Sequence, residues 1–314
     1  MAIGETQVVF GGAGLLGDAL VRRLLKEGSN KVTIFDIYPP KDDLLSDPRI
    51  LFIRGNVESL DFDSIIKIMG DAQTLFYKVG SLGDPSISSD ADKSWDYLSI
   101  NALSFWKLLP VIANTNVNTI VVDSSITAVS DLSYDSPISE LKRIGTPTNF
   151  YGLSKAILED ICLFEEHKSK LRIRIIRYPR VYSSTQNSFL VKFATNIYNG
   201  EPIKIFGNPD KLIDLIHIED ATETAIRCMQ YRGKESVFHA SYNETLTLTA
   251  IAHLMCKKAR RPRHQIIHSD NGVAPREPKN ASLNSVISQR ALQVDYVYSL
   301  EKILDEVLEN AGIT

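Results

Sequence analysis

The feature that most constrains the fold is a glycine-rich segment, Gly11-Gly-Ala-Gly-Leu-Leu-Gly17, which follows an apolar run and opens an amphipathic one. The run Thr6–Phe10 has the composition of a β-strand, and apolar residues recur at helical spacing through residues 14–27. Gly28 then marks the end of the helix. The order of strand, glycine turn and helix predicts the first unit of a parallel α/β sheet.

The same turn predicts a ligand. Glycines let bare backbone approach a phosphate, and a helix N-terminus presents N–H groups and a partial positive charge, so we expect a dinucleotide pyrophosphate here. The spacing is G-x-x-G-x-x-G rather than the commoner G-x-G-x-x-G, and the alternative is a turn that only packs the helix on the strand. The predicted contacts are Gly11, Gly14, Leu15, Leu16 and Gly17.

A second strand, Lys31–Asp36, ends on an acidic residue. A carboxylate at this place accepts hydrogen bonds from the ribose hydroxyls of the adenosine and repels a 2′-phosphate. No Arg or Lys follows until Lys41, so the sequence favours NAD over NADP. The alternative is that Asp36 is an ordinary residue at a strand end.

Composition excludes several other classes of protein. A net charge of −3 gives no electrostatic reason to expect nucleic acid or an anionic membrane. No apolar run approaches the roughly 20 residues of a membrane span, and the N-terminus lacks a signal-peptide pattern. The three scattered cysteines predict buried, reduced thiols in a cytoplasmic protein, and the six histidines show no metal-ligand spacing.

Strands and helices alternate in the first half of the chain and become irregular after Tyr178. We therefore expect a Rossmann-like doubly wound parallel sheet, in the α/β class, over residues 1–180 with a later contribution from residues 213–241. A smaller α/β substrate-binding region should comprise residues 181–212 and 242–314. Further helices are expected at residues 95–115 and 151–168, among others.

Tyr151 and Lys155 predict the chemistry. Residues four apart share one face of a helix, so both side chains can point toward a bound cofactor. A phenol with a pKa of about 10 is a poor base, but a nearby Lys⁺ and an oxidised nicotinamide both favour phenolate. Tyr151 would then take a hydroxyl proton while hydride leaves the same carbon. Such a pair is common on solvated helix faces, and only the glycine turn makes it specific.

Together these segments resemble the extended short-chain dehydrogenase/reductase family, in particular its NAD-dependent epimerase/dehydratase branch acting on nucleotide sugars. The resemblance covers nearly the whole chain, and it assigns the three cofactor glycines, the ribose acid and the catalytic Tyr/Lys pair as above. Further matching elements are Gly55-Asn56-Val57 beside the adenine, Asn101 in the helix before the catalytic strand, Asp123-Ser-Ser-Ile-Thr-Ala-Val-Ser130 at that strand's end, Arg177-Tyr-Pro-Arg-Val-Tyr182, and Asp214-Leu-Ile-His-Ile-Glu-Asp220.

The resemblance implies roles for other residues. Counting four residues back from Val129 selects Ser125 to orient the substrate oxygen, with Ser124 and Thr127 as alternatives and Thr127 also touching substrate. Lys155 would also hold the nicotinamide ribose. The remaining predicted cofactor contacts are Asn56, Val57, Lys78 and Tyr178.

Two departures from the family pattern matter. Tyr77-Lys78-Val79-Gly80 replaces His-Leu-Ala-Ala, so we expect altered cofactor contacts, with Lys78 a solvated charge rather than a catalytic group. Ile126 and Thr127 replace the acidic residues of 4,6-dehydratases and decarboxylases, which argues against a dehydratase.

The substrate is expected to be a nucleotide diphosphate sugar. Ile213 replaces a family arginine, and Arg180 and Arg276 are the predicted clamp for the diphosphate. The alternative is that Arg180 pairs with a structural acid.

Three functions follow. The first is an NAD-dependent nucleotide-sugar epimerase with a transient ketone, and the second is a dehydrogenase or ketoreductase with net redox turnover. The third is a non-catalytic NAD-binding sensor. The resemblance also implies a homodimer through residues 95–115 and 151–168, whose apolar residues include Leu103, Trp106, Leu109, Ile112, Ile157, Ile161 and Phe164.

Overall fold

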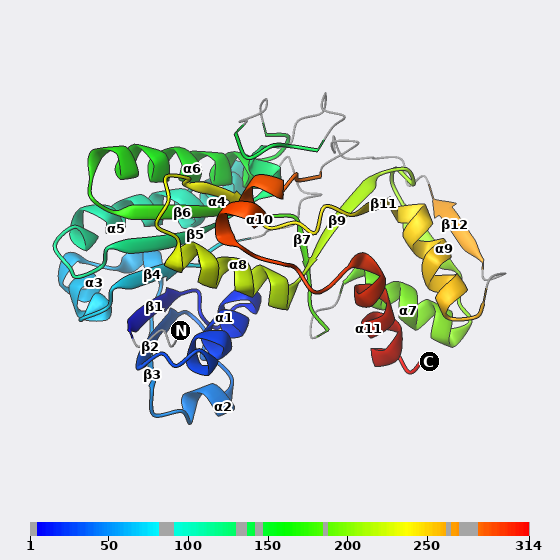
Figure 1. The fold of residues 1–314 in the computed structure, drawn as a ribbon, viewed down its shortest axis with the longest axis horizontal. Coiled ribbons are helices and arrows are strands. Elements are labelled where there is room, and N and C mark those ends of the chain that lie inside the picture. Colours follow the sequence, from blue (N-terminus) through cyan, green and yellow to red (C-terminus); the bar gives the residue numbers. More distant parts are fainter. Residues whose placement is uncertain are drawn as a thin grey trace.

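A parallel seven-stranded sheet forms the centre of the molecule, with strand order β10-β6-β5-β4-β1-β2-β3 (Figure 1). The computed structural model describes residues 5–81, 91–129, 137–141, 147–184, 188–261, 265–269 and 282–313. The strands of this sheet are β1 (Thr6–Phe10), β2 (Lys31–Asp36), β3 (Ile50–Arg54), β4 (Thr74–Tyr77), β5 (Thr119–Ser125), β6 (Arg172–Tyr178) and β10 (Val237–His239).

Helices cover both faces of this sheet, as expected for parallel strands that are apolar on both sides. One face packs against α3, α5 and α6 through the apolar cluster that contains Val8, Leu75 and Ile120. The other packs against α1 and α8 through the cluster that contains Val9 and Phe76. The helices are α1 (Leu15–Lys26), α3 (Phe62–Met69), α4 (Ala91–Leu98), α5 (Ser104–Ile112), α6 (Phe150–Lys168) and α8 (Ile218–Gln230), with the short α2 (Asp42–Leu45) and α10 (Val286–Leu292).

The strand order reverses at β1, which pairs with β2 on one side and β4 on the other. In an open parallel sheet, ligands bind beyond the carboxyl ends of the strands at such a reversal. The glycine turn follows β1 at this place, so the fold puts the predicted cofactor turn where a ligand site is expected.

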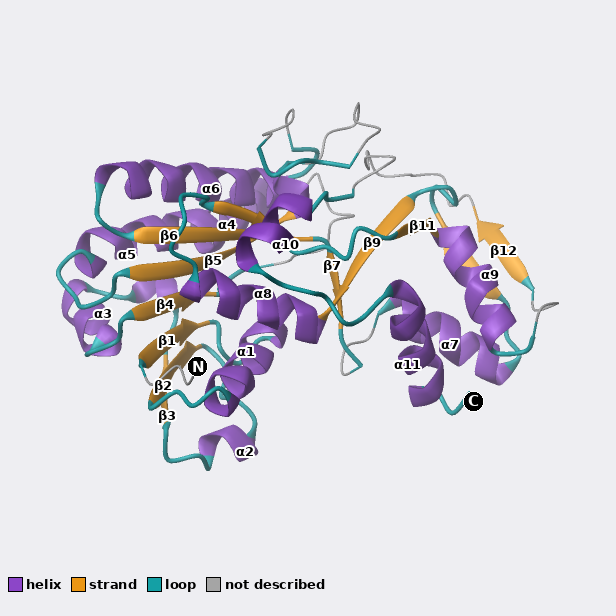
Figure 2. Cartoon of the chain, in the orientation of Figure 1, coloured by secondary structure: helices purple, strands orange, loops and turns teal. Residues whose placement is uncertain are grey.

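The later part of the chain forms a smaller lobe (Figures 1 and 2). It has its own apolar core, which includes Tyr182, Ile203 and Leu304. Its strands form a three-stranded sheet, β11-β9-β7, and a two-stranded one, β12-β8. The elements are β7 (Arg180–Tyr182), α7 (Phe189–Asn199), β8 (Ile203–Phe206), β9 (Leu212–His217), β11 (Thr245–Thr247), α9 (Leu248–Lys258), β12 (Ile266–Ser269) and α11 (Leu300–Asn310).

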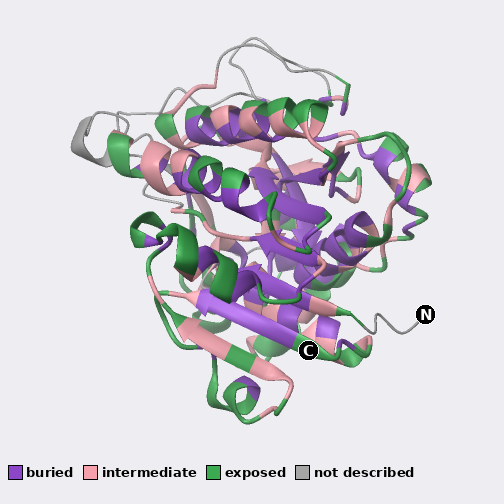
Figure 3. Cartoon of the chain, turned by 90° about the vertical axis from the view of Figure 1, so that its left-hand side faces the viewer, coloured by how far each residue is buried: buried purple, intermediate pink, exposed green. Residues whose placement is uncertain are grey.

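The α/β fold class and the doubly wound parallel sheet are confirmed. One expected helix differs in its bounds: the helical stretch expected at residues 95–115 starts at Ala91 and ends at Ile112. A π-helical turn, Ser99–Leu103, separates α4 from α5 and carries the buried Asn101. The three cysteines are buried and free, as expected. Figure 3 shows the buried strands between the helical layers.

Within the described part of the chain, no helix has both the length and the apolar character needed to cross a bilayer. No cluster of three or more His, Cys, Asp or Glu side chains in the same part could hold a metal ion.

Candidate active site

The glycine turn is shaped for a close approach of backbone to a ligand. Gly11 has φ 79°, a left-handed conformation that favours glycine. A Cβ placed on Gly17 would lie 2.1 Å from the carbonyl oxygen of Gly11, so no side chain fits there. Gly14 is the N-cap of α1 and provides no side-chain cap, which leaves the first N–H groups of the helix for an anion. This turn fits the pyrophosphate of a dinucleotide.

Asp36 lies at the end of β2 and is joined to the glycine turn. Its Oδ2 accepts a hydrogen bond from the backbone N–H of Ala13 at 2.9 Å, and its Oδ1 accepts one from that of Tyr38 at 3.1 Å. Each carboxylate oxygen keeps a second lone pair, so the group can still accept hydrogen bonds from ribose hydroxyls. The predicted ribose acid is thus beside the predicted phosphate turn.

Tyr151 and Ser125 meet at the carboxyl end of β5. Asn149 caps the start of α6 through the N–H of Gly152, which fixes the first helical turn and with it Tyr151. The phenol of Tyr151 hydrogen bonds with Ser125, and the hydroxyl of Thr127 donates to Ser125 Oγ at 2.9 Å. Ser124 instead donates to Glu159 at 2.5 Å and is buried, which supports Ser125 as the serine that faces substrate.

Lys155 lies one helical turn beyond Tyr151 and is only 4% exposed. Its Nζ donates to the backbone oxygen of Asp123 at 2.9 Å. A Cβ on Gly80 would be 3.3 Å from this Nζ, so the chain after β4 passes directly over the ammonium. Asn101 holds that chain in place through Ser81, with hydrogen bonds of 2.7 and 3.2 Å, and holds α6 through Ser154 at 2.9 Å.

Comparison with known proteins agrees with this geometry. Residues 7–241 match the model of the NAD dependent epimerase/dehydratase family. The chain belongs to this family. Its dependence on NAD and its class as an extended short-chain dehydrogenase/reductase enzyme follow from that membership, and the resemblance inferred from the sequence is confirmed.

Individual relatives are distant. A UDP-glucuronate 4-epimerase of Thermodesulfobacterium geofontis is 23% identical over 266 residues, which are 81% of this chain and 82% of that protein. The uncharacterized protein y4nG of Sinorhizobium fredii is 24% identical over 240 residues, 76% of this chain but only 56% of that protein. A UDP-glucuronic acid 4-epimerase from Bacillus cereus, solved with UDP-glucuronic acid and NAD, superposes with a TM-score of 0.83 at 20% identity, covering 98% of this chain and 99% of that one.

The pKa values of Tyr151 and Lys155 differ from the expectation that the nearby lysine favours a phenolate. Burial raises the pKa of Tyr151 to about 12, although the hydrogen bond with Ser125 opposes the shift and the charge of Asp123 adds to it. Burial also lowers the pKa of Lys155 to about 8, while Asp123 opposes that shift. The phenol is therefore neutral in the protein alone, because desolvation outweighs the opposing hydrogen bond with Ser125.

Lys78 is where the sequence interpretation was wrong. Its side chain is only 2% exposed and its Nζ lies 2.6 Å from Oδ1 of Asp123, so it is a buried ion-paired group and not a solvated charge. Its backbone carbonyl carbon lies 2.7 Å from where a Cβ of Gly11 would stand. Contact with the cofactor stays a prediction for the backbone of this residue.

The other predicted cofactor residues are spread along the carboxyl edge. Asn56 caps the 3₁₀ turn Val57–Ser59 by accepting from the N–H of Glu58 at 3.0 Å, and Val57 is buried. Tyr178 ends β6 and is buried. These contacts with NAD also stay predictions.

Of the two arginines predicted to bind the diphosphate, the structure describes only Arg180. Arg180 is exposed at the start of β7, directly beyond the end of β6. Among the residues that the structure describes, none forms an ion pair with it, so the alternative of a structural acid finds no support there. Arg276 lies outside the described residues, and its role remains a prediction.

Sequence reasoning assigned no role to Asp123, Glu159 and Arg177, three charged residues around this site. Asp123 holds both Lys78 and Lys155, and Glu159 receives the guanidinium of Arg177 at 2.7 and 2.9 Å. A signal was available for Glu159, because it stands four residues beyond Lys155 on the same helix face. Asp123 and Lys78 each directly follow an apolar strand run, where polar residues indicate the ligand edge of a parallel sheet.

Proposed function

We propose that the protein is an NAD-dependent epimerase of a nucleotide sugar. The observation that carries this proposal is the convergence of Ser125, Tyr151 and Lys155 at the carboxyl edge of the sheet that carries the glycine turn. The relatives named as UDP-sugar 4-epimerases support the choice of substrate class. Ile126 and Thr127, which lack the carboxylates a dehydratase uses, support epimerisation over elimination.

The residues divide the work as follows. Bound NAD supplies the hydride acceptor and later the hydride donor. Tyr151 takes the proton of a ring hydroxyl as the C–H bond breaks, so the carbon becomes a ketone, and gives the proton back when hydride returns to the opposite face. Ser125 donates a hydrogen bond to the substrate oxygen and holds it against Tyr151. The pKa of Tyr151 is about 12 in the protein alone, so Lys155 must act on the phenol together with the positive charge that bound, oxidised NAD would supply, and proton transfer would depend on the cofactor.

The predicted preference for NAD has a direct test. Calorimetry should show NAD binding much more tightly than NADP, because the Asp36 carboxylate repels a 2′-phosphate. Asp36→Ala should reduce that preference. Equal affinity of the parent protein for both dinucleotides would contradict the assigned role of Asp36.

One experiment tests the proposed reaction. Native mass spectrometry of the purified protein shows whether NAD(H) is retained, and incubation with a panel of nucleotide sugars then shows what is made. Formation of an epimer without net NADH supports the proposal. Accumulating NADH or ketone indicates the alternative, a dehydrogenase or ketoreductase. Silence across the panel, with NAD bound, leaves a non-catalytic NAD-binding protein.

We further propose that Arg180 binds the diphosphate of the substrate, aided by Arg276. A guanidinium forms bidentate, charge-assisted hydrogen bonds with phosphate, and Arg180 is exposed just beyond a sheet strand. Arg180→Ala and Arg276→Ala should each raise KM for the nucleotide sugar, and UDP, GDP or dTDP should compete. If neither variant changes KM and no diphosphate competes, the substrate is a smaller carbonyl compound.

The remaining proposals concern assembly, organisation and location. The exposed apolar side chains of α4, α5 and α6 support a two-fold dimer through these helices: Trp95 is 62% exposed, Trp106 59% and Phe164 66%. Leu109 and Ile112, expected on that surface, are instead buried in the subunit's own core. Sedimentation that finds only a 35.1 kDa species at micromolar concentration would contradict the dimer. We keep the division at residue 180, with residues 213–241 returning to the first domain, and a cytoplasmic location.

A further inference from the structure

Lys78 and Asp123 form a buried ion pair at the ends of two neighbouring strands. β4 and β5 pair in parallel with Tyr77 opposite Val122, so the next residues along, Lys78 and Asp123, are also opposite each other. Side chains alternate along a strand, and Phe76 and Val121 belong to the cluster under α1 and α8. The pair therefore lies on that face of the sheet, with Nζ and Oδ1 2.6 Å apart.

Asp123 is held from two sides. Its carboxylate receives Lys78, while its backbone oxygen receives Lys155 from α6 at 2.9 Å. Lys78 and Lys155 thus both contact a single aspartate, whose charge also reaches Tyr151. The charge of Asp123 raises the pKa of Tyr151, and burial raises the pKa of Asp123 while both lysines oppose that shift.

The other ionisable groups around this cluster do not change its balance. Glu159 of α6 is paired with Arg177 of β6, with side chains only 5% and 4% exposed. Burial raises the pKa of the nearby phenols and thiols above their ordinary values, so they are neutral near pH 7: these are Tyr178, Tyr296, Cys162 and Cys228. Lys78, Lys155 and Arg177 against Asp123 and Glu159 leave one net positive charge.

This balance determines what acts on Tyr151. Without Lys78, the carboxylate of Asp123 would cancel the charge of Lys155, and the cluster would be neutral. We propose that Lys78 is a positioning residue for the proposed epimerase: its ammonium compensates Asp123, so that the positive charge of Lys155 acts undiminished on Tyr151. The inference rests on the proposed role of Tyr151 as the base, and it assigns a function to a lysine at a position where the family pattern has leucine.

A ladder of charge variants in the NAD-loaded protein tests the proposal. Lys78→Met removes one positive charge and should move the acidic limb of the pH–turnover profile up by about one pH unit. Asp123→Asn removes the negative charge and should move it down. The double variant Lys78→Met/Asp123→Asn restores the net charge and should return the limb close to that of the parent, and Lys78→Arg should keep it.

A second readout needs no substrate. NMR of [¹³C]tyrosine in the same NAD-loaded proteins, assigned with Tyr151→Phe, follows the ionisation of Tyr151 itself and should give the same order. The NMR measurement distinguishes failure of the proposed epimerase function from failure of the role of Lys78, since the variants can show the expected order of Tyr151 pKa values even if no nucleotide sugar is turned over.

The proposal is supported if the pKa of Tyr151 is lowest in Asp123→Asn, similar in the parent and the double variant, and highest in Lys78→Met. If Lys78→Met fails to fold, the double variant still tests it, because exchanging a whole buried ion pair for neutral groups leaves no uncompensated charge. A double variant that titrates unlike the parent, or an Asp123→Asn protein that titrates like it, overturns the proposal.

Discussion

Helix α6 and strand β6 are joined by two Glu–Arg ion pairs, one near each end of β6, and the two pairs have different surroundings. At the carboxyl end of β6, Glu159 and Arg177 are 2.7 Å apart with both side chains at most 5% exposed. At the amino end, Glu166 and Arg174 are 2.6 Å apart, but Glu166 is 21% exposed. The two glutamates are seven residues apart, two turns of one helix. Two ion pairs of the same residue types therefore connect the same helix to the same strand and can be compared directly.

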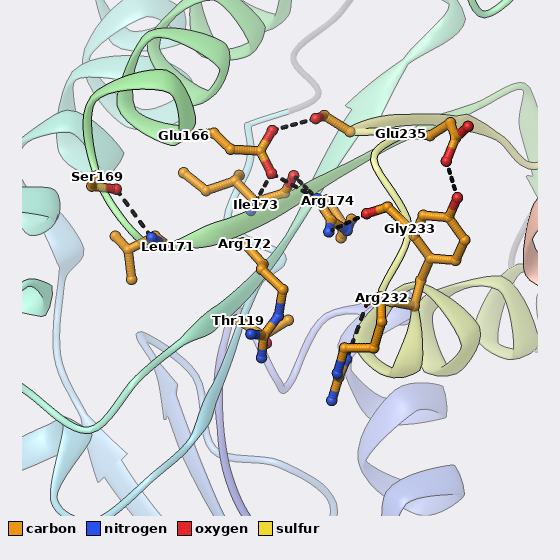
Figure 4. A network of polar contacts seen from close by, with 12 residues as sticks. Thr119, Glu166, Ser169, Leu171, Arg172, Ile173, Arg174, Arg232, Gly233 and Glu235 are labelled. Carbon is orange, nitrogen blue, oxygen red and sulfur yellow. Dashed lines mark hydrogen bonds and ion pairs between the residues drawn. The ribbon is translucent and has the colours of Figure 1, made fainter.

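The ion pair at the amino end of β6, Glu166–Arg174, also forms hydrogen bonds with neighbouring segments (Figure 4). Glu166 accepts from the backbone N–H of Ile173 at 3.1 Å and from Ser236, and Arg174 donates to the backbone oxygen of Gly233 at 3.2 Å. Arg172 and Arg232 add further positive charge, and the pKa of Arg172 is lowered first by burial and then by the charges of Arg232 and Arg174. The contacts of Glu166 and Arg174 thus join α6, β6 and the segment before β10 to one another.

The carboxyl-end pair connects to the site. Glu159 also accepts from Ser124, the residue before Ser125, and Arg177 contacts the ring of His239 at 3.3 Å. Burial and then Arg177 lower the pKa of His239 to about 3, so the ring is neutral and adds no charge. The two ion pairs have similar geometry and differ in their further partners: only the pair at the carboxyl end reaches Ser124, next to the proposed catalytic Ser125, so we expect only this pair to affect turnover.

The largest difference in turnover is expected when a tyrosine near each end of β6 is replaced by phenylalanine. Tyr151→Phe removes the proposed base and should lower turnover by roughly 10³-fold, within the range of a general acid–base group. NAD binding should stay within a few-fold, because the phenol makes little contribution to it. Tyr231→Phe, beside Arg174 at the amino end, is the matched control and should leave turnover almost unchanged. Steady-state rates on the true substrate and calorimetry with NAD measure both, and a near-normal rate for Tyr151→Phe would refute the mechanism.

A smaller but clear effect is expected from Glu159→Gln. The variant keeps the shape of the side chain but leaves Arg177 charged and buried without a counter-ion, which should cost about 3 kcal/mol of unfolding free energy. Turnover should fall as well, because a glutamine amide holds the Ser124 hydroxyl less firmly than the carboxylate does, and the adjoining Ser125 is then less well fixed. Urea unfolding and rate measurements on the folded fraction test the two effects separately. Unchanged stability would mean that Arg177 is solvated in solution.

The sequence predicted what depends on local pattern and missed what depends on register. The glycine turn, Asp36 at a strand end and the Tyr151/Lys155 face of one helix all follow from spacing within a few residues, and the structure has them together. The Lys78–Asp123 pair joins residues 45 apart, and it exists only because β4 and β5 align with one register. Exposure of Leu109 was misjudged for a related reason: which apolar face of α5 meets the sheet is set by packing.

The smallest effect is expected from Glu166→Gln. The amide oxygen of glutamine can still accept from Ile173, and water reaches this side chain. Arg174 is itself buried, but it keeps its hydrogen bonds to the backbone oxygens of Ile173 and Gly233, so mainly the charge-assisted part of its interaction with Glu166 is lost. The loss should be about 1 kcal/mol of unfolding free energy, and turnover should not change. Urea unfolding beside Glu159→Gln, with rates on the same substrate, gives the ratio between the two ends directly. Were Glu166→Gln to slow turnover as much as Glu159→Gln, both ion pairs would act through the rigidity of α6, and the functional distinction between the two ends of β6 would be lost.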